Sequence, residues 1–258
     1  MIAVHTASFV AQETGYAMHG WGHGDRMTNE AFAPLATFAG RFDSLLGHIQ
    51  ALGFDVIDIW GAHLSPAWAT EEHVDLARAV LERRGMRVAT YAPWIDAANV
   101  WRACEVAAAL DASIVGAGFA GDAEPIARAF HEHGLRLAVE NHPERTPAEL
   151  LEKIARGHGV FGATVDTGWW ATQGYDAARA IEELGAHVLH VHLKDVLGEG
   201  EPHETCRFGE GIVDVRECVR ALGRIGYEGA ITVEHEPETS DPSDDLCAMR
   251  AELEEWLA

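Results

Sequence analysis

The sequence has few cysteines, few basic residues and no long apolar run. Its four cysteines show no Cys-x-x-Cys spacing, which favours reduced thiols over a disulfide framework. Lysine and arginine number 19 against 41 aspartates and glutamates, and the resulting formal charge of −22 opposes binding to nucleic acid. No apolar run approaches the ~20 residues that cross a bilayer, and no basic leader precedes an apolar stretch at the start. We therefore expect a cytoplasmic protein that binds neither nucleic acid nor membrane.

The sequence is rich instead in short apolar runs that alternate with segments of helical periodicity. Eight such pairs in 258 residues are what a (β/α)8 barrel requires. An open doubly wound sheet is the alternative, but no Gly-rich phosphate fingerprint follows the first run. No low-complexity linker divides the chain, so the predicted fold class is α/β, with residues 1–258 forming one TIM barrel. The predicted strands are Ile2–Val10, Asp55–Gly61, Arg87–Ala92, Ser113–Gly116, Arg136–His142, Val160–Gly168, His187–Val196 and Ala230–Glu236.

One stretch between the first two strands has no periodicity. Ala11–Thr28 is rich in Gly, His, Trp and Met, and a loop of that length is either disordered or functional. Its aromatic and histidine content favours a lid. We predict that it covers the mouth of the barrel and contributes His19, Trp21 or His23 to the substrate pocket.

The stretch His187–Val196 carries the clearest pattern. His190, His192 and Lys194 alternate with apolar residues, so they share one face of a strand. Three polar groups on one face suit neither a core nor a solvent edge. The pattern indicates a strand that runs up into a polar, ligand-filled mouth.

Three other predicted strands carry an acidic residue near their C-terminal ends. Glu140, Asp166 and His192 lie 26 residues apart each time, one βα unit per step, and Glu234 follows on the last strand. In a parallel barrel these ends meet at one face. Each carboxylate alone could cap a helix or pair with an arginine. Three carboxylates and one imidazole on four consecutive strands favour a shared divalent cation, and this set of ligands suits Mn²⁺ or Mg²⁺.

The motifs in this half of the chain resemble the xylose isomerase-like barrel superfamily, and more closely its sugar-phosphate isomerase/epimerase and inosose dehydratase branch. The matching motifs are Glu-Asn-His at 140–142, Asp-Thr-Gly at 166–168, His-Leu-Lys-Asp at 192–195, Gly-Glu-Gly at 209–211 and Val-Glu-His at 233–235. The resemblance implies one ion on Glu140, Asp166, His192 and Glu234. The ion would be Mn²⁺ or Mg²⁺, with Co²⁺ and Zn²⁺ as alternatives. The resemblance also implies that Glu140 and Glu234 flank the substrate carbon and move its protons.

Epimerases of this superfamily commonly have Asp-x-x-His on strand six, whereas Trp169 stands at that fourth position here. An indole can stack on a sugar face but cannot accept a proton. Trp169 is therefore predicted to bind substrate. The remaining candidates for substrate contact each have a plainer alternative: loop packing for His142, a salt bridge for Lys194, a surface position for Arg207 and His63, and packing for Trp21.

These features predict an enzyme, a metal-dependent isomerase or epimerase that deprotonates a keto-sugar or related polyhydroxylated carbonyl compound. A dehydratase or lyase on a keto-cyclitol or keto-glycoside is the alternative, because both reactions share an enediolate. A DNA-repair endonuclease of the superfamily is disfavoured. Its extra metal ligands would fall on Trp169, His203 and Thr205. A non-catalytic barrel or partner subunit is a further alternative, and the formation of a homo-oligomer is left open.

Overall fold

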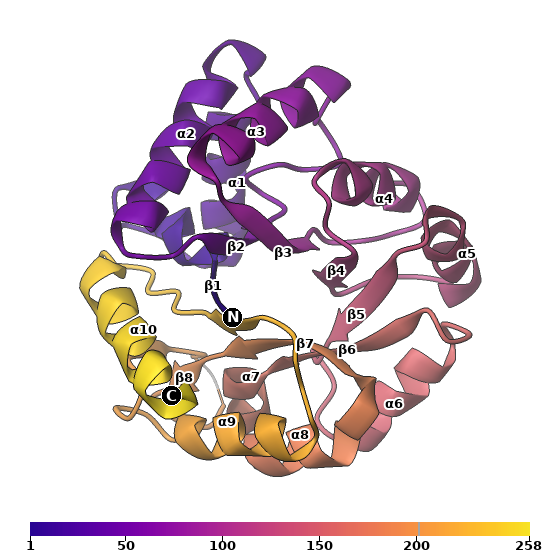
Figure 1. Cartoon of the computed structure of the whole chain (residues 1–258), viewed down its shortest axis with the longest axis vertical. Helices are drawn as coiled ribbons and strands as arrows, with labels where there is room; N and C mark the ends of the chain where they lie inside the picture. The colour runs from indigo at the N-terminus through magenta and orange to yellow at the C-terminus, as the bar shows by residue number, and fades with distance from the viewer. Residues whose placement is uncertain (201) are drawn as a thin grey trace.

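The computed structural model describes residues 1–200 and 202–258 as a ring of parallel strands surrounded by helices (Figure 1). Eight strands close into a barrel in the order β1-β10-β7-β6-β5-β4-β3-β2. The predicted single (β/α)8 fold class is therefore confirmed. The barrel strands are β1 (Ile2–His5), β2 (Val56–Trp60), β3 (Arg87–Ala92), β4 (Ile114–Ala117), β5 (Arg136–Glu140), β6 (Phe161–Asp166), β7 (Val188–Leu193) and β10 (Ile231–Val233).

Ten α-helices and two 3-10 segments connect these strands in the described part of the chain. Local signals explain several of their ends. Thr70 caps α3 through a capping box with His73, and Gly85 ends the same helix in the left-handed conformation. The helical segments are η1 (Thr6–Thr14), α1 (Trp21–Phe32), α2 (Leu35–Ala51), α3 (Glu71–Arg84), α4 (Val100–Ala109), α5 (Ala123–His133), α6 (Pro147–Ala155), α7 (Thr167–Thr172), α8 (Ala177–Leu184), η2 (Gly185–His187), α9 (Val215–Arg224) and α10 (Ser243–Leu257). The described helices include none that is both long and apolar enough to span a bilayer.

Strand β6 shows how apolar and polar side chains alternate along a barrel strand. Phe161, Ala163 and Val165 belong to the apolar core, whereas the alternate residues Thr164 and Asp166 are buried polar groups. Thr164 donates a hydrogen bond to the carbonyl of Ala138 on β5. Polar residues thus alternate with apolar ones along a fully buried strand.

The segment predicted as a lid loop is largely helical, so that prediction is wrong in form. Strand β1 ends at His5, η1 follows at once, and α1 begins at Trp21. One of the glycines that weaken the helical pattern serves close packing: a Cβ on Gly24 would lie 2.3 Å from the Met18 sulfur and 2.6 Å from Val10. Tertiary packing has overridden local propensity.

The loop after β7 is fastened to the barrel by one buried carboxylate. Asp195 Oδ2 accepts hydrogen bonds from the backbone N–H groups of Gly209 and Gly211, and Oδ1 accepts from those of Val196 and Val213. A two-stranded ladder, β8 (Asp195–Val196) with β9 (Thr205–Cys206), adds to this attachment. The Lys-Asp and Gly-x-Gly motifs are thus parts of one local structure.

Candidate metal centre

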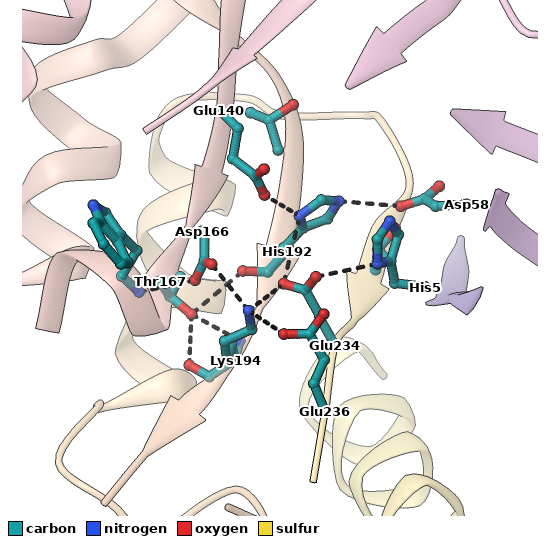
Figure 2. Close-up of polar contacts among 12 residues, drawn as sticks. His5, Asp58, Glu140, Asp166, Thr167, His192, Lys194, Glu234 and Glu236 are labelled. Carbon is teal, nitrogen blue, oxygen red and sulfur yellow. Dashed lines mark hydrogen bonds and ion pairs between the residues drawn. The ribbon is translucent and has the colours of Figure 1, made fainter. Parts of the chain in front are cut away.

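The four predicted ligands lie at one end of the barrel. Glu140 and Asp166 are the last residues of β5 and β6, His192 is the penultimate residue of β7, and Glu234 directly follows β10. Parallel pairing sets Asp166 opposite His192 and His192 opposite Thr232. Figure 2 shows these side chains converging from neighbouring strands. Adjacent strands therefore bring together residues that are far apart in the sequence.

Three of the four form one compact group. His192 Nδ1 lies 2.7 Å from Glu140 Oε1 and 3.5 Å from Glu234 Oε2. One donor atom from each of these residues lies within 4.8 Å of the others. Two carboxylates and one imidazole are ligands that a divalent ion of the Mn²⁺ or Mg²⁺ type accepts in proteins. The donor set fits such an ion.

Asp166 belongs to a second group that shares Glu140 with the first. Its donor oxygen lies within 4.8 Å of donor atoms on Glu140 and His142. Asp166 Oδ1 caps α7 by accepting from the backbone N–H of Trp169 at 2.9 Å, and Oδ2 lies 3.1 Å from His142 Nε2. Asp166 is thus beside the other three ligands, although its oxygens already have partners.

Lys194 supplies a positive charge among these carboxylates. Its ammonium Nζ lies 2.9 Å from Glu234 Oε2, 3.1 Å from Asp166 Oδ2 and 2.8 Å from Glu236 Oε2 (Figure 2). Burial opposes its charge, but the coulombic attraction of Asp166 and Glu234 holds its pKa well above the ordinary value. Two roles were left open for Lys194, substrate contact and a salt bridge. The structure shows the salt bridge.

The protonation of the acids differs across the group. Burial opposes the ionisation of Glu140 and Glu234, yet neighbouring cations hold both pKa values below normal: His142 and His192 for Glu140, Lys194 and His192 for Glu234. Glu236 behaves in the opposite way, because burial and the negative charge of Glu234 raise its pKa to about 8. Lys194 and His142 likewise hold the pKa of Asp166 below normal against the effect of burial, so near neutral pH the centre holds three carboxylates, and Glu236 alone among these four acids retains a proton readily.

A cavity of about 500 Å³ opens onto these groups. Four of the predicted substrate-contacting residues line it, namely His142, Trp169, Lys194 and Trp21. The Trp169 indole packs against the His142 ring with centroids 4.4 Å apart. The cavity thus has a charged floor with an aromatic wall. The segment Ala11–Thr28 contributes Gly20, Trp21 and Asp25 to its lining.

Two residues predicted to contact substrate, Arg207 and His63, lie outside the cavity lining. Arg207 pairs with Glu252 of α10 at 2.7 Å and lines a neighbouring cleft, because its side chain turns toward α10. His63 is only 1% exposed, with Nδ1 3.2 Å from Thr6 Oγ1 and its ring packed edge-on against Phe32. It is a core residue, and burial lowers its pKa to about 3.

The predicted lid histidines also take another place. The rings of His19 and His23 stack on each other with centroids 5.5 Å apart, and His23 Nδ1 accepts the backbone N–H of His19. Both residues are at least partly exposed, and among described residues the cavity lining includes neither. Of the three lid side chains proposed, Trp21 alone lines it.

Sequence reasoning missed three polar residues in and around the centre. His5 Nδ1 lies 3.1 Å from Glu234 Oε1, and Glu236 contacts Lys194. Asp58 is fully buried and contacts His190 and His192. Two features of the sequence could have identified Asp58 and Glu236. Asp58 is a charged residue inside the apolar run Val-Ile-Asp-Ile-Trp, and Glu236 is an acid two residues beyond Glu234.

Comparisons with known proteins agree with this architecture. A family described as "Xylose isomerase-like TIM barrel" matches residues 46–258. The uncharacterized protein MJ1311 of Methanocaldococcus jannaschii is 30% identical over 113 residues, which cover 40% of this chain and only 38% of that relative.

Two solved structures show the same fold over nearly the whole chain. One is the probable 3-DHS dehydratase AsbF, involved in petrobactin synthesis, from Bacillus anthracis. It has a TM-score of 0.71 and 15% identity, with 98% of each chain covered. The other is an L-ribulose 3-epimerase with a TM-score of 0.71 and 16% identity, covering 99% of this chain and 94% of that one.

Proposed function

Because the chain belongs to the xylose isomerase-like TIM barrel family, we propose that it is a metal-dependent isomerase or epimerase. Its substrate would be a keto-sugar or a related small polyhydroxylated carbonyl compound. The observation that carries this proposal is the pair Glu140 and Glu234, which approach His192 Nδ1 from different strands at the floor of the cavity. A small-molecule substrate, rather than nucleic acid, also suits the net charge of −22.

The metal proposal rests on the donor set. Glu140, His192 and Glu234 would hold a divalent ion, Mn²⁺ or Mg²⁺ by ligand chemistry, with Asp166 as the fourth predicted ligand. When bound, such an ion supplies Lewis acidity that polarises a carbonyl and acidifies the neighbouring C–H bond. Asp166 has to exchange a partner in order to join the ion, because its oxygens contact His142 and Lys194.

The two glutamates supply the proton chemistry. Their depressed pKa values keep them ionised near neutral pH, so either can act as general base. The C–H bond breaks, its electron pair forms the enediolate, and the proton passes to the carboxylate oxygen. Return of a proton to the opposite face gives the epimer, and return to the adjacent carbon gives the isomer.

The cavity walls would orient the substrate. Lys194 and His142 can donate hydrogen bonds to hydroxyl or carbonyl oxygens, since both line the cavity. Trp169, Trp21 and Trp60 offer apolar faces on which a sugar ring can stack. A compact polyol with one apolar face matches this lining.

Dehydration is a second candidate, favoured by Glu236. With a pKa raised to about 8, this residue is protonated near neutral pH while it lines the same cavity. A carboxylic acid beside an enediolate can protonate a departing β-hydroxyl, which leaves as water as the double bond forms. In this mechanism Glu140 or Glu234 removes the proton and Glu236 donates one.

Solvent exchange tests both candidates. Purified protein with Mn²⁺ is incubated in D₂O with a panel of keto-sugars and keto-cyclitols, and deuterium incorporation is followed by NMR. We expect exchange at the carbon next to the carbonyl, lost in Glu234→Gln and retained in the surface control Glu252→Gln. Loss of water that depends on Glu236 would select dehydration. Turnover of a substrate with neither exchange nor metal dependence would overturn the proposal.

A further inference from the structure

Asp58 is a charged residue in the middle of strand β2, and none of its surface is exposed. The pairing of β2 with β3 shifts register between Ile57 and Asp58. At this irregularity Asp58 Oδ1 accepts the backbone N–H of Thr90 at 3.1 Å. One carboxylate oxygen is thereby fixed to the strand ladder, which leaves the other with a defined direction.

The second oxygen points at two histidines of β7. Asp58 Oδ2 lies 2.6 Å from His190 Nε2 and 3.4 Å from His192 Nε2. Figure 2 shows Asp58 and Glu140 on opposite edges of the His192 ring. Because side chains two residues apart on a strand share a face, a single carboxylate can reach both rings.

This arrangement determines which nitrogen of His192 can serve as a ligand. Nδ1 lies 2.7 Å from Glu140 Oε1 and 3.5 Å from Glu234 Oε2, so it faces the candidate ion site. Nε2 faces Asp58. A neutral imidazole carries its hydrogen on one nitrogen and its lone pair on the other. A cation that takes the place of the Nδ1 hydrogen leaves the remaining hydrogen on Nε2, where the Asp58 carboxylate lies 3.4 Å away.

We propose that Asp58 is a positioning residue for the metal centre, which orients His192 and fixes its Nε2–H tautomer for metal binding through Nδ1. The inference rests on the proposed function, since that function makes His192 a ligand. Carboxylates that hold a metal-bound histidine in this way raise its basicity, and their loss weakens metal affinity by roughly 10- to 100-fold. Strand β2 would thus supply a residue that orients one ligand of a metal site, whose ligands come from β5, β7 and the end of β10.

His190 completes the arrangement. Its ring lies edge-on to His192 with centroids 5.1 Å apart, and its Nε2 also lies 3.2 Å from Thr232 Oγ1. Two imidazoles around one carboxylate give that buried charge the partners it needs. Thr232 touches His190 but sits on β10, so it offers a control that alters the cluster without altering Asp58.

The first experiment is calorimetric titration of metal-free protein with Mn²⁺. Asp58→Asn, which keeps the volume and removes the charge, should weaken binding about 10- to 100-fold. Thr232→Val should bind within about twofold of the wild type, a far smaller change than the loss of a carboxylate beside a metal-bound histidine causes. Equal affinity of Asp58→Asn and the wild type would overturn the positioning role alone. A wild-type protein that binds no Mn²⁺ would overturn this role and the proposed function together.

The second experiment needs no variant and covers the case in which Asp58→Asn fails to fold. Ring nitrogens of ¹⁵N-histidine-labelled wild-type protein are observed by NMR after loading with diamagnetic Zn²⁺. We expect His192 to carry hydrogen on Nε2 and the metal on Nδ1. Metal on Nε2, or no change at His192, would contradict the inference.

Discussion

The two halves of the barrel meet the same cavity with different chemistry. Strands β1, β2 and β3 bring His5, Trp60 and Ala92 to its lining, while the second half brings Glu140, His192, Lys194 and Glu234 among others. The first half is mainly aromatic and apolar at this surface, and the second half is mainly charged. One half is therefore suited to hold a substrate face and the other to perform proton transfer.

The difference also appears in how each half satisfies its buried polar groups. In the second half, acids and bases compensate one another directly, as in the contacts of Lys194 with Asp166 and Glu234. At the cavity surface of the first half, Trp60 Nε1 makes a single hydrogen bond, donated to Asp25 Oδ1 at 2.8 Å. Removing Lys194 should thus disturb several partners, whereas removing the Trp60 indole N–H should disturb one.

The largest expected effect is on catalysis in the charged half. Glu234→Gln removes a base and a ligand, so kcat/KM should fall by about 10²- to 10⁴-fold. Steady-state kinetics with the substrate found by solvent exchange would measure it. Trp60→Phe in the other half, which removes a single hydrogen bond, should keep activity within about tenfold. Equal losses of kcat/KM in the two variants would show that the two halves do not differ in their contribution to catalysis.

Lys194→Met tests the electrostatic part of the comparison. Removing a buried cation leaves three acids facing one another, and a broken buried pair costs about 3–5 kcal/mol of folding free energy. Urea unfolding of the metal-free protein at pH 7 would measure this. The matched control is Lys153→Met, because Lys153 pairs with one acid, Glu144 at 2.8 Å, and both side chains keep some exposure, so its loss should cost less than the loss of Lys194. A Lys194→Met variant as stable as the control would show that the charges are not coupled.

The pH dependence of folding stability tests the burial of His63 in the first half of the barrel. Its pKa of about 3 in the folded protein lies below the ordinary 6.5 of the unfolded chain. Below pH 6.5 the unfolded chain therefore binds a proton that the folded protein does not. Stability should fall by about 1.4 kcal/mol per pH unit from this group as pH drops from 6.5 toward 3. Urea unfolding at pH 7, 6 and 5 should show a shallower fall in His63→Gln, and parallel curves would refute the assignment.

The smallest expected effect concerns substrate stacking. Trp169→Ala should raise KM several-fold and leave kcat nearly unchanged, because aromatic stacking of about 0.5–1.5 kcal/mol acts equally on ground and transition states. Trp101, a partly exposed tryptophan of α4 that packs against His133, provides the control for tryptophan loss. A fall in kcat with unchanged KM would assign Trp169 to the chemical step instead.

The barrel and the position of the candidate centre were accessible from the sequence because both depend on local periodicity. Alternation along 187–196 identifies a strand face, and the 26-residue interval from Glu140 to Asp166 to His192 places one polar group at each successive strand end. Closure of a parallel barrel then makes those ends neighbours. No knowledge of side-chain conformation was needed.

What could not be read from the sequence depends on the directions of long side chains and on packing between distant segments. Arg207 reaches Glu252 on α10, forty-five residues away, rather than the cavity. The helix α1 forms where Gly24 meets Met18 and Val10 closely, although its glycines suggest a loop. The partnership of Asp58 with β7 spans 132 residues and leaves no spacing pattern.

The four backbone hydrogen bonds accepted by Asp195 have a consequence for redesign. Because they attach residues 209–213 to the barrel, residues 197–200 and 202–204 can be varied without shifting the segment beyond them. Gly211 sets the limit of this freedom, since a Cβ there would lie 2.2 Å from the Val196 carbonyl oxygen. A library that varies residues 197–200 and 202–204 while holding Asp195 and Gly211 constant would therefore explore substrate preference on an unchanged scaffold.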